Sequence, residues 1–191
     1  MKISTILIGA ALCLSLLFGC ERREEPKSPI VSPATDHARN SADPQGPYYH
    51  GLIEEYRAVL AGDPRNLAAL IALGNAYFDT GHWKAAITFY DHALMLDPQN
   101  ADVRADMGTA YRNMGMSDRA LAEYHRVLQQ DPGHVNARYN LGIVYAFDKK
   151  DHAAAIHAWE ELLKLAPNHP QADYIRSTIA TFKKGAAKEG Q

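Results

Sequence analysis

Cysteine is missing from nearly the whole of this sequence. The two cysteines, Cys13 and Cys20, both lie within the first twenty residues. The rest of the chain has no thiol that could form a disulfide, hold a metal as a thiolate or act as a nucleophile. Thiol-based redox chemistry is therefore excluded for everything that follows Cys20.

Recognised catalytic motifs are missing as well. The sequence contains no GxGxxG or GxxxxGK phosphate loop, no GxSxG turn, and no HExxH, CxxC or CxxCH motif. Its nine histidines are spread along the chain, and its acidic residues form no recognisable pair for acid–base work. We expect no catalytic residue, no metal site, no cofactor and no small-molecule substrate; an enzyme or metal carrier is a remote alternative.

Neither sign of charge is in excess. The chain has 20 Lys plus Arg against 22 Asp plus Glu. It has no long basic run and no stripe of basic and aromatic residues of the kind that follows a phosphate backbone. We therefore expect no nucleic-acid partner.

One long apolar run is present, from Ile3 to Phe18. It has the length of the apolar segment of a secretory signal and is marginal for spanning a bilayer. Residues Leu17 to Cys20 resemble a bacterial lipobox. The resemblance implies that residues 1–19 are a lipoprotein signal peptide and that Cys20 is lipidated. An uncleaved helical anchor and ordinary signal cleavage are the alternatives.

Residues 20–47 have the composition of a disordered tether. They are polar, and almost nothing among them could be buried in a core. The lipobox resemblance implies a protein that is lipid-anchored in the bacterial cell envelope and faces the periplasm. Glu21 favours the outer membrane, because it replaces the aspartate that retains lipoproteins at the inner membrane in some bacteria. The prolines of the tether are Pro26, Pro29, Pro33, Pro44 and Pro47.

Beyond residue 48 the sequence repeats with a period of 34 residues. Four kinds of position keep this period: a glycine, a tyrosine three residues after it, a further tyrosine and a proline. A period of this length with these residue types predicts stacked helix-turn-helix units. The positions are Gly74, Gly108 and Gly142; Tyr77, Tyr111 and Tyr145; Tyr56, Tyr90 and Tyr124; and Pro64, Pro98 and Pro132.

These residues resemble tetratricopeptide repeats. The matching segments are residues 73–98, 107–132 and 141–167. The third has one extra residue, which we place in the turn around Asp148 to Asp151. The resemblance implies an all-α solenoid with three full repeats. Glycine inside a helix costs about 1 kcal/mol relative to alanine, so the repeated glycines also predict close packing between paired helices.

Both ends of the repeat array have a covering segment. Tyr49 to Leu60 matches only the second helix of a unit, which predicts an N-terminal half-repeat cap. Apolar residues at helical spacing predict a C-terminal closing helix, so that residues 48–184 form the repeat domain and residues 185–191 a frayed tail. The apolar face of the closing helix consists of Ala172, Ile175, Ile179 and Phe182.

The resemblance implies a peptide-binding groove on the concave face, formed by the first helix of each unit. Its lining is apolar and aromatic, and Arg112 is the cation that would orient a peptide. In the alternative interpretation, Phe78 and Phe147 lie partly in the core between helices. The positions carried over are Ile71, Asn75, Phe78, Asp79, Thr109, Arg112, Asn113, Tyr139, Ile143 and Phe147.

One known use of such grooves does not fit this sequence. Members that bind chaperones clamp a C-terminal carboxylate with lysine and arginine. Here Asn75 matches the clamp, but Ile71 replaces a lysine, and Asp106 and Asn140 occupy other clamp positions. We therefore expect a different partner.

The sequence as a whole predicts a membrane-anchored scaffold that binds a protein or peptide. Residues 155–179 resemble part of the repeat domains of bacterial c-type cytochrome biogenesis factors, which implies a chaperone for an apocytochrome. The alternative is an assembly lipoprotein of a pilus, a secretin or an outer-membrane complex.

Overall fold

The computed structural model describes residues 46–189. The predicted signal peptide, the lipidation site Cys20 and most of the predicted tether lie outside the described residues. In the described part every regular element is helical. The elements are α1 (Gly46–Gly62), α2 (Leu67–Asp79), α3 (Trp83–Leu96), α4 (Ala101–Asn113), α5 (Ser117–Gln130), α6 (Val135–Ile143), the π-helical turn η1 (Val144–Asp148), α7 (His152–Leu165) and α8 (Ala172–Glu189).

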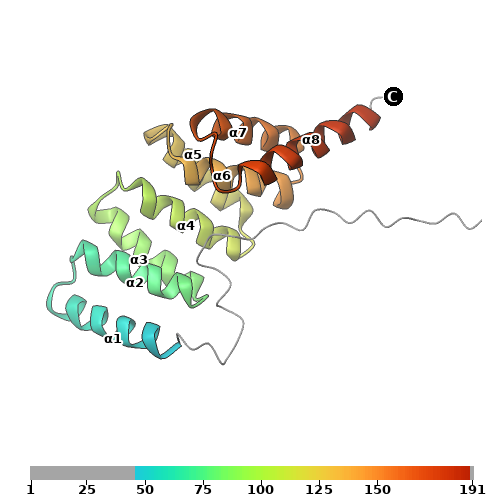
Figure 1. Ribbon diagram of the computed structural model, residues 1–191. Helices are drawn as coiled ribbons and strands as arrows, with labels where there is room; N and C mark the ends of the chain where they lie inside the picture. The colour runs from blue at the N-terminus through green and yellow to red at the C-terminus, as the bar shows by residue number, and fades with distance from the viewer. Residues whose placement is uncertain (1–45, 190–191) are drawn as a thin grey trace, which may run out of the picture.

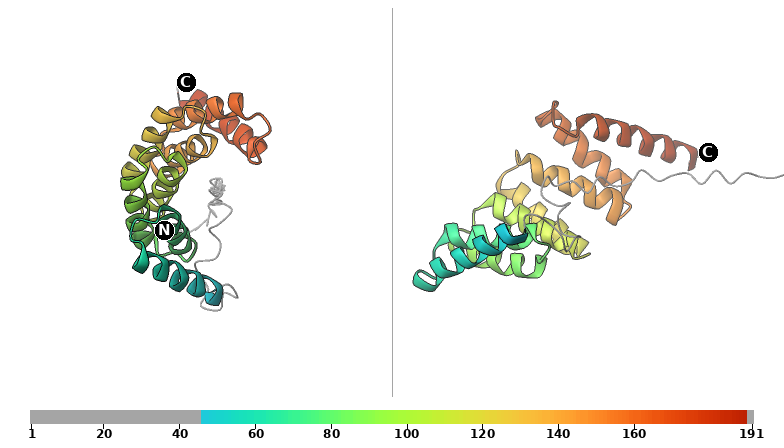
Figure 2. Two further views of the ribbon diagram at one scale, coloured as in Figure 1. Left: turned by 90° about the vertical axis from the view of Figure 1, so that its left-hand side faces the viewer. Right: turned by 60° about the horizontal axis from the view of Figure 1, so that its bottom comes forward.

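The helices form a stack of pairs. Helix α2 packs on α3, α4 on α5, and α6 with η1 on α7, while α1 covers α2 and α8 packs against α7. Figure 1 shows this order from α1 at the bottom to α8 near the top, and the left view of Figure 2 shows that the stack curves into an arc. The predicted all-α solenoid, with three full repeats, a half-repeat cap and a closing helix, is confirmed.

The two end helices are longer than the sequence suggested. Helix α1 begins at Gly46, inside the predicted tether, with Pro47 in its first turn, where a missing backbone N–H costs nothing. Helix α8 continues past Lys184 to Glu189, so residues 185–189 of the predicted frayed tail are helical. Its C-terminal half projects beyond the other helices (Figure 1).

Within each repeat, a glycine of the first helix contacts an aromatic ring of the second. A Cβ atom placed on Gly108 would lie 2.8 Å from Cε1 of Tyr124. Any side chain at these positions would overlap a fully buried ring, so the absence of a Cβ lets the two helices approach. The close packing predicted from the glycines is thus explained. The other two contacts are Gly74 with Tyr90 and Gly142 with Trp159.

A side chain caps the N-terminus of the first helix in every repeat. Asn66 accepts a hydrogen bond from the backbone N–H of Ala69, and Asn100 does the same for Val103. In the third repeat His134 takes this role, since its Nδ1 accepts from the N–H of Ala137 at 3.1 Å. Such caps satisfy N–H groups that the helix itself leaves without a partner.

The extra residue of the third repeat lies in its first helix and not in the following turn. In the first two repeats the turn contains a glycine with positive φ, Gly81 at 74° and Gly115 at 75°. In the third repeat the equivalent residue is Lys150, with φ 56°. It lies one residue further from the glycine of its first helix than Gly81 and Gly115 do in their repeats. The additional residue is absorbed by η1, whose wider π-helical turn ends the helix. Our placement around Asp148 to Asp151 is corrected accordingly.

The core is continuous along the stack. One cluster of buried side chains joins α2, α3 and α4, a second joins α4 through α7, and a third joins α6, η1, α7 and α8. Each repeat therefore buries its apolar face against its neighbours, as expected for a solenoid. Among residues 46–189 no helix has both the length and the apolar character needed to cross a bilayer.

Candidate functional site

Four of the residues predicted to line a peptide groove are buried, and two of them, Phe78 and Ile143, are not among the residues that line the pocket described below. Phe78 is 7% exposed and packs with side chains of α3 and α4. Ile143 is 2% exposed and packs with side chains of α7 and α8. Neither offers surface to a partner, which corrects their assignment as groove residues.

Two more of the predicted residues receive tyrosine hydroxyls from the second helices. The ring of Tyr90 packs against Gly74, and the hydroxyl of Tyr90 donates to Oδ1 of Asn75 at 2.9 Å. In the next repeat the hydroxyl of Tyr124 lies 3.0 Å from Oγ1 of Thr109. Burial raises the pKa of both phenols, so both stay protonated. Asn75 and Thr109 therefore help to fix the helix pairs.

Arg112 is not an unpaired cation. Its guanidinium makes two hydrogen bonds to the carboxylate of Asp148, at 2.8 and 3.1 Å. The two side chains are only 15% and 22% exposed. Because this ion pair joins α4 to η1, Arg112 connects the second and third repeats, and the orienting role predicted for it is corrected.

Four further predicted residues are partly exposed. They lie in α2, at the end of α4 and in η1, and they are Ile71, Asp79, Asn113 and Phe147. The ring of Phe147 packs against the buried ring of Trp159, with the two centroids 6.3 Å apart. This contact leaves the surface less apolar than the sequence suggested.

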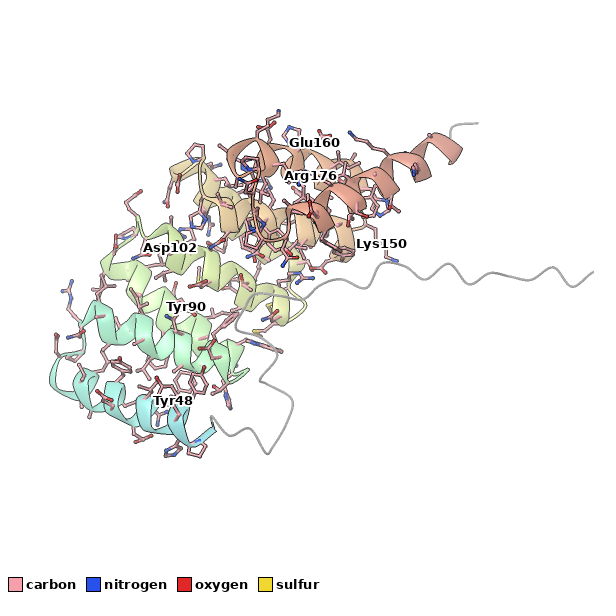
Figure 3. All side chains as sticks on the ribbon, viewed as in Figure 1. Tyr48, Tyr90, Asp102, Lys150, Glu160 and Arg176 are labelled. Atoms are coloured by element: carbon pink, nitrogen blue, oxygen red, sulfur yellow. The ribbon has the colours of Figure 1, made fainter. Side chains whose placement is uncertain are left out.

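A pocket of about 490 Å³ opens between α4, α6 and the segment that connects α7 to α8. Helices α4 and α6 are first helices of adjacent repeats and contact each other directly, as expected on the inner side of the arc. Figure 3 shows Asp102, one of its lining residues, near the start of α4. The lining is Asp102, Ala105, Asp106, Thr109, His134, Asn136, Tyr139, Asn140, His169, Pro170 and Gln171.

The charged groups of the pocket are acidic. Asp102 and Asp106 are one helical turn apart on α4 and share a face, and neither lysine nor arginine is among the lining residues. Burial, and after it the nearby carboxylates of Asp102 and Asp79, together raise the pKa of Asp106 to about 6. Two carboxylates thus lie together in a lining that contains no lysine or arginine.

The two histidines of the pocket are held as neutral rings. The Nδ1 atom of His134 accepts a backbone N–H, so the proton of the ring is on Nε2, which lies 3.1 Å from Oδ1 of Asp102. The Nδ1 atom of His169 accepts the N–H of Gln171 at 3.1 Å, and burial lowers the pKa of this ring. Neither ring therefore cancels the negative charge of the aspartates.

Tyr139 is the most buried aromatic residue of the pocket. It is 6% exposed, and its ring lies 5.2 Å from that of His169. Its hydroxyl is buried and has no hydrogen-bond partner within residues 46–189. Burial raises the pKa of this phenol, so the hydroxyl keeps its proton. A protonated hydroxyl can both donate and accept.

Of this lining, sequence reasoning named Thr109 and Tyr139 as groove residues, and Asp106 and Asn140 only as clamp positions that do not fit. The repeat period held a signal for the others: Asp102 and Asn136 are 34 residues apart, and so are Asp106 and Asn140. These pairs mark the same two positions on adjacent first helices. His169 and Gln171 follow α7 outside the repeat pattern, so the period gave no indication of them.

Comparisons with known proteins agree with this architecture. A family model described as a tetratricopeptide repeat matches residues 105–173, and one described as a TPR repeat matches residues 74–115. The structure "Crystal structure of MamA protein" has a TM-score of 0.66 at 27% identity and covers 74% of this chain and 75% of that chain. "Crystal structure of MamA" has a TM-score of 0.63 at 24% identity and covers 79% and 95%. No curated protein sequence matches this chain.

The fold is thus a tetratricopeptide-repeat solenoid, a scaffold for contacts between proteins. Among the described residues no cluster of three or more His, Cys, Asp or Glu side chains could hold a metal ion.

Proposed function

We propose, from the tetratricopeptide-repeat fold, that this chain is a membrane-anchored scaffold of the bacterial cell envelope that holds a protein partner on its inner surface. The observation that carries the binding role is the pocket between α4, α6 and the α7–α8 connection. It is large enough for a side chain with its flanking backbone, and its wall offers amide, hydroxyl and carboxylate groups.

The membrane anchor rests on the sequence before residue 46. Residues Leu17 to Cys20 resemble a lipobox, so Cys20 would carry two acyl chains. Each methylene of these chains that is buried in the membrane contributes about 0.8 kcal/mol to membrane binding. A Cys20→Ser variant should lose incorporation of labelled palmitate and leave the membrane fraction. Retention in the membrane without labelling would point to an uncleaved helical anchor instead.

The partner we favour is a newly exported apocytochrome, because residues 155–179 resemble those of c-type cytochrome biogenesis factors. This segment includes α7 and the connection to α8. His169, Pro170 and Gln171 of that connection line the pocket. A segment resembling the chaperones therefore forms part of the proposed binding surface.

In-cell photocrosslinking tests both the binding surface and the type of partner. A photoreactive amino acid at Asn136, which is exposed and lines the pocket, should capture a protein that the same probe at His92 of α3 does not. Transient capture of apocytochromes supports the chaperone. One stable, stoichiometric envelope protein supports the alternative, an assembly lipoprotein. Equal capture at Asn136 and His92 would contradict binding on the inner surface.

A further inference from the structure

Helix α1 leaves an apolar face open at one end of the stack. It corresponds to the second helix of a repeat, because Tyr56 precedes Tyr90 by one period. No first helix precedes it among residues 46–189. Val59 of α1 is therefore 40% exposed, whereas Val127, at the same position of α5, is completely buried. Tyr56 is partly exposed as well, although Tyr90 is buried.

Helix α8 corresponds to a first helix, at the other end of the stack. Its register is set by an arginine that α4, α6 and α8 share, whose Nη2 donates to the carbonyl of a proline in the preceding loop. The pairs are Arg104 with Pro98, Arg138 with Pro132, and Arg176 with Pro167. The residue three positions after this arginine is buried in all three helices, and these residues are Met107, Leu141 and Ile179.

Another face of α8 carries small side chains that are exposed. One, four and five residues after the arginine come Ser177, Ala180 and Thr181, all of them exposed. A second helix covers this face in the other repeats, but none follows α8 in the described part of the chain. The counterparts in α4, all buried, are Ala105, Gly108 and Thr109.

A hydrogen bond inside the second repeat has its two counterparts at the two ends of the stack. The hydroxyl of Tyr124 on α5 lies 3.0 Å from Oγ1 of Thr109 on α4. Tyr56 of α1 stands at the position of Tyr124, and Thr181 of α8 stands at that of Thr109. The two end helices could therefore form the same bond with each other.

An ion pair of the second repeat has its counterparts there too. Nη1 of Arg104 on α4 donates to Glu123 on α5 at 3.1 Å. Arg176 of α8 stands at the position of Arg104, and Glu55 of α1 stands at that of Glu123. Within one chain Nη1 of Arg176 bonds Asp173, an exposed residue of its own helix, and Glu55 is exposed.

This combination of arginine and glutamate is not a general property of the repeats. The first repeat has Leu70 and Phe89 at the two positions, and the third has Arg138 and Ala158. The two ends of the chain thus match each other in a pair of charged residues that the repeats beside them lack. Such complementarity selects a partner and fixes its register.

We propose that α8 of one chain pairs with α1 of a second copy, so that two copies complete one repeat between them. The two surfaces differ, so the contact is head-to-tail and can continue into a row of copies. Helices α1 and α8 lie at opposite ends of the stack (Figure 1), so one chain cannot make this contact with itself. Ala180 has the Cβ that Gly108 lacks, which keeps this junction wider and weaker than an internal pair.

Cross-linking of the full chain in its membrane tests the contact. Val59 and Ser177 should face each other across the junction, because their counterparts Val127 and Ala105 pack in one core cluster. Both are exposed in the single chain, and the chain after Cys20 has no other thiol. With a short bismaleimide, the double variant Val59→Cys/Ser177→Cys should give a ladder of dimers, trimers and longer products.

Single variants show whether the contact is head-to-tail. Val59→Cys alone and Ser177→Cys alone should give no product, because identical positions do not meet. Co-expression of the two single variants with different tags should give a dimer that contains both tags and nothing longer. The control replaces Val59→Cys by His92→Cys, at an exposed position of α3, and should give no ladder.

Charge reversal tests the predicted register. In the double-cysteine chain, Glu55→Arg should reduce the cross-linked product about tenfold, since two guanidinium groups would then face each other. Addition of Arg176→Glu should restore the ladder. Asp91→Arg, at an exposed position of α3, is the matched control and should leave the ladder unchanged. Thermal unfolding shows whether each variant is folded.

Three results would overturn the inference: no ladder from the double-cysteine chain, a dimer from either single variant, or no recovery of the ladder in the folded charge-reversed chain. The inference goes beyond the proposed function and is independent of it. If Asn136 captures a partner while no ladder forms, the proposed function stands and this inference alone is wrong. A ladder without capture at Asn136 would remove the inner binding surface and leave the assembly.

Discussion

Arg112 of α4 and Asp148 of η1 are joined by two hydrogen bonds, of 2.8 and 3.1 Å. The pair spans the joint between the second and third repeats, and both side chains are mostly shielded from water. Its geometry depends on η1, because the extra residue of the third repeat is absorbed in that turn just before Asp148.

Removal of this pair should weaken the joint between the repeats. Arg112→Ala and Asp148→Ala should each lower the free energy of unfolding by about 1–2 kcal/mol, and the double variant should lose less than the sum. Urea unfolding of the four proteins in the cycle measures the coupling. A coupling energy near zero would show that the ion pair contributes nothing to stability.

The contact between Gly108 and Tyr124 predicts opposite effects of one substitution at two positions. Gly108→Ala should destabilise the protein by about 1–3 kcal/mol, because the new methyl group would overlap the buried ring. Gly51→Ala is the matched change in an open part of α1, and better helix propensity should stabilise the protein there by about 0.5–1 kcal/mol. Thermal unfolding compares the two; equal effects would contradict the contact.

The positive φ of Lys150 predicts a stabilising substitution. Its backbone has φ 56°, a conformation that glycine adopts without steric strain. Lys150→Gly should raise the free energy of unfolding by about 0.5–1 kcal/mol. The reverse change in the second repeat, Gly115→Ala at φ 75°, should lower it by a similar amount. Destabilisation by Lys150→Gly would show that this lysine side chain has a structural contact of its own.

The raised pKa of Asp106 predicts a pH-dependent gain from its removal. Folding raises this pKa from its ordinary 3.8 to about 6, so the folded chain binds more protons between these values and loses stability as the pH rises. Asp106→Asn should therefore stabilise the protein by about 1 kcal/mol at pH 7, after allowance for solvent screening. The gain should shrink as the pH falls from 6 to 4.

Denaturant unfolding across this pH range is the measurement. The groups that face Asp106 from neighbouring helices are Asp79 of α2, the phenol of Tyr90 on α3 and that of Tyr124 on α5, together with Asp102 of its own helix. Both phenols stay protonated throughout this range. A gain that is independent of pH would mean that Asp106 has an ordinary pKa.

The repeat period predicted most of the fold because it records packing directly. Within the first helices, glycine is needed where Tyr90, Tyr124 or Trp159 packs against the helix, so its recurrence indicated how the helices pair. The period could not show where the extra residue would lie, since a longer turn and a π-helical turn are equally compatible with the sequence. For the same reason, the sequence could not show that Asp148 pairs with Arg112.

The candidate site was harder to predict than the fold. Phe78 and Ile143 lie on first helices, as groove residues do, but their side chains pack in the core between helices. The pocket lies where the third repeat meets the α7–α8 connection. His169 and Gln171 reach it from outside the period, so no pattern of spacing could have included them.

The position of Trp159 makes it useful as a fluorescence probe. Its indole is fully buried and donates to the backbone carbonyl of Tyr139 at 3.2 Å, so the chromophore is attached to a residue that lines the pocket. The other tryptophan, Trp83, lies at the start of α3, in the first repeat. With Trp83 replaced by phenylalanine, the emission of Trp159 becomes an intrinsic optical probe of the third repeat alone, without any attached dye.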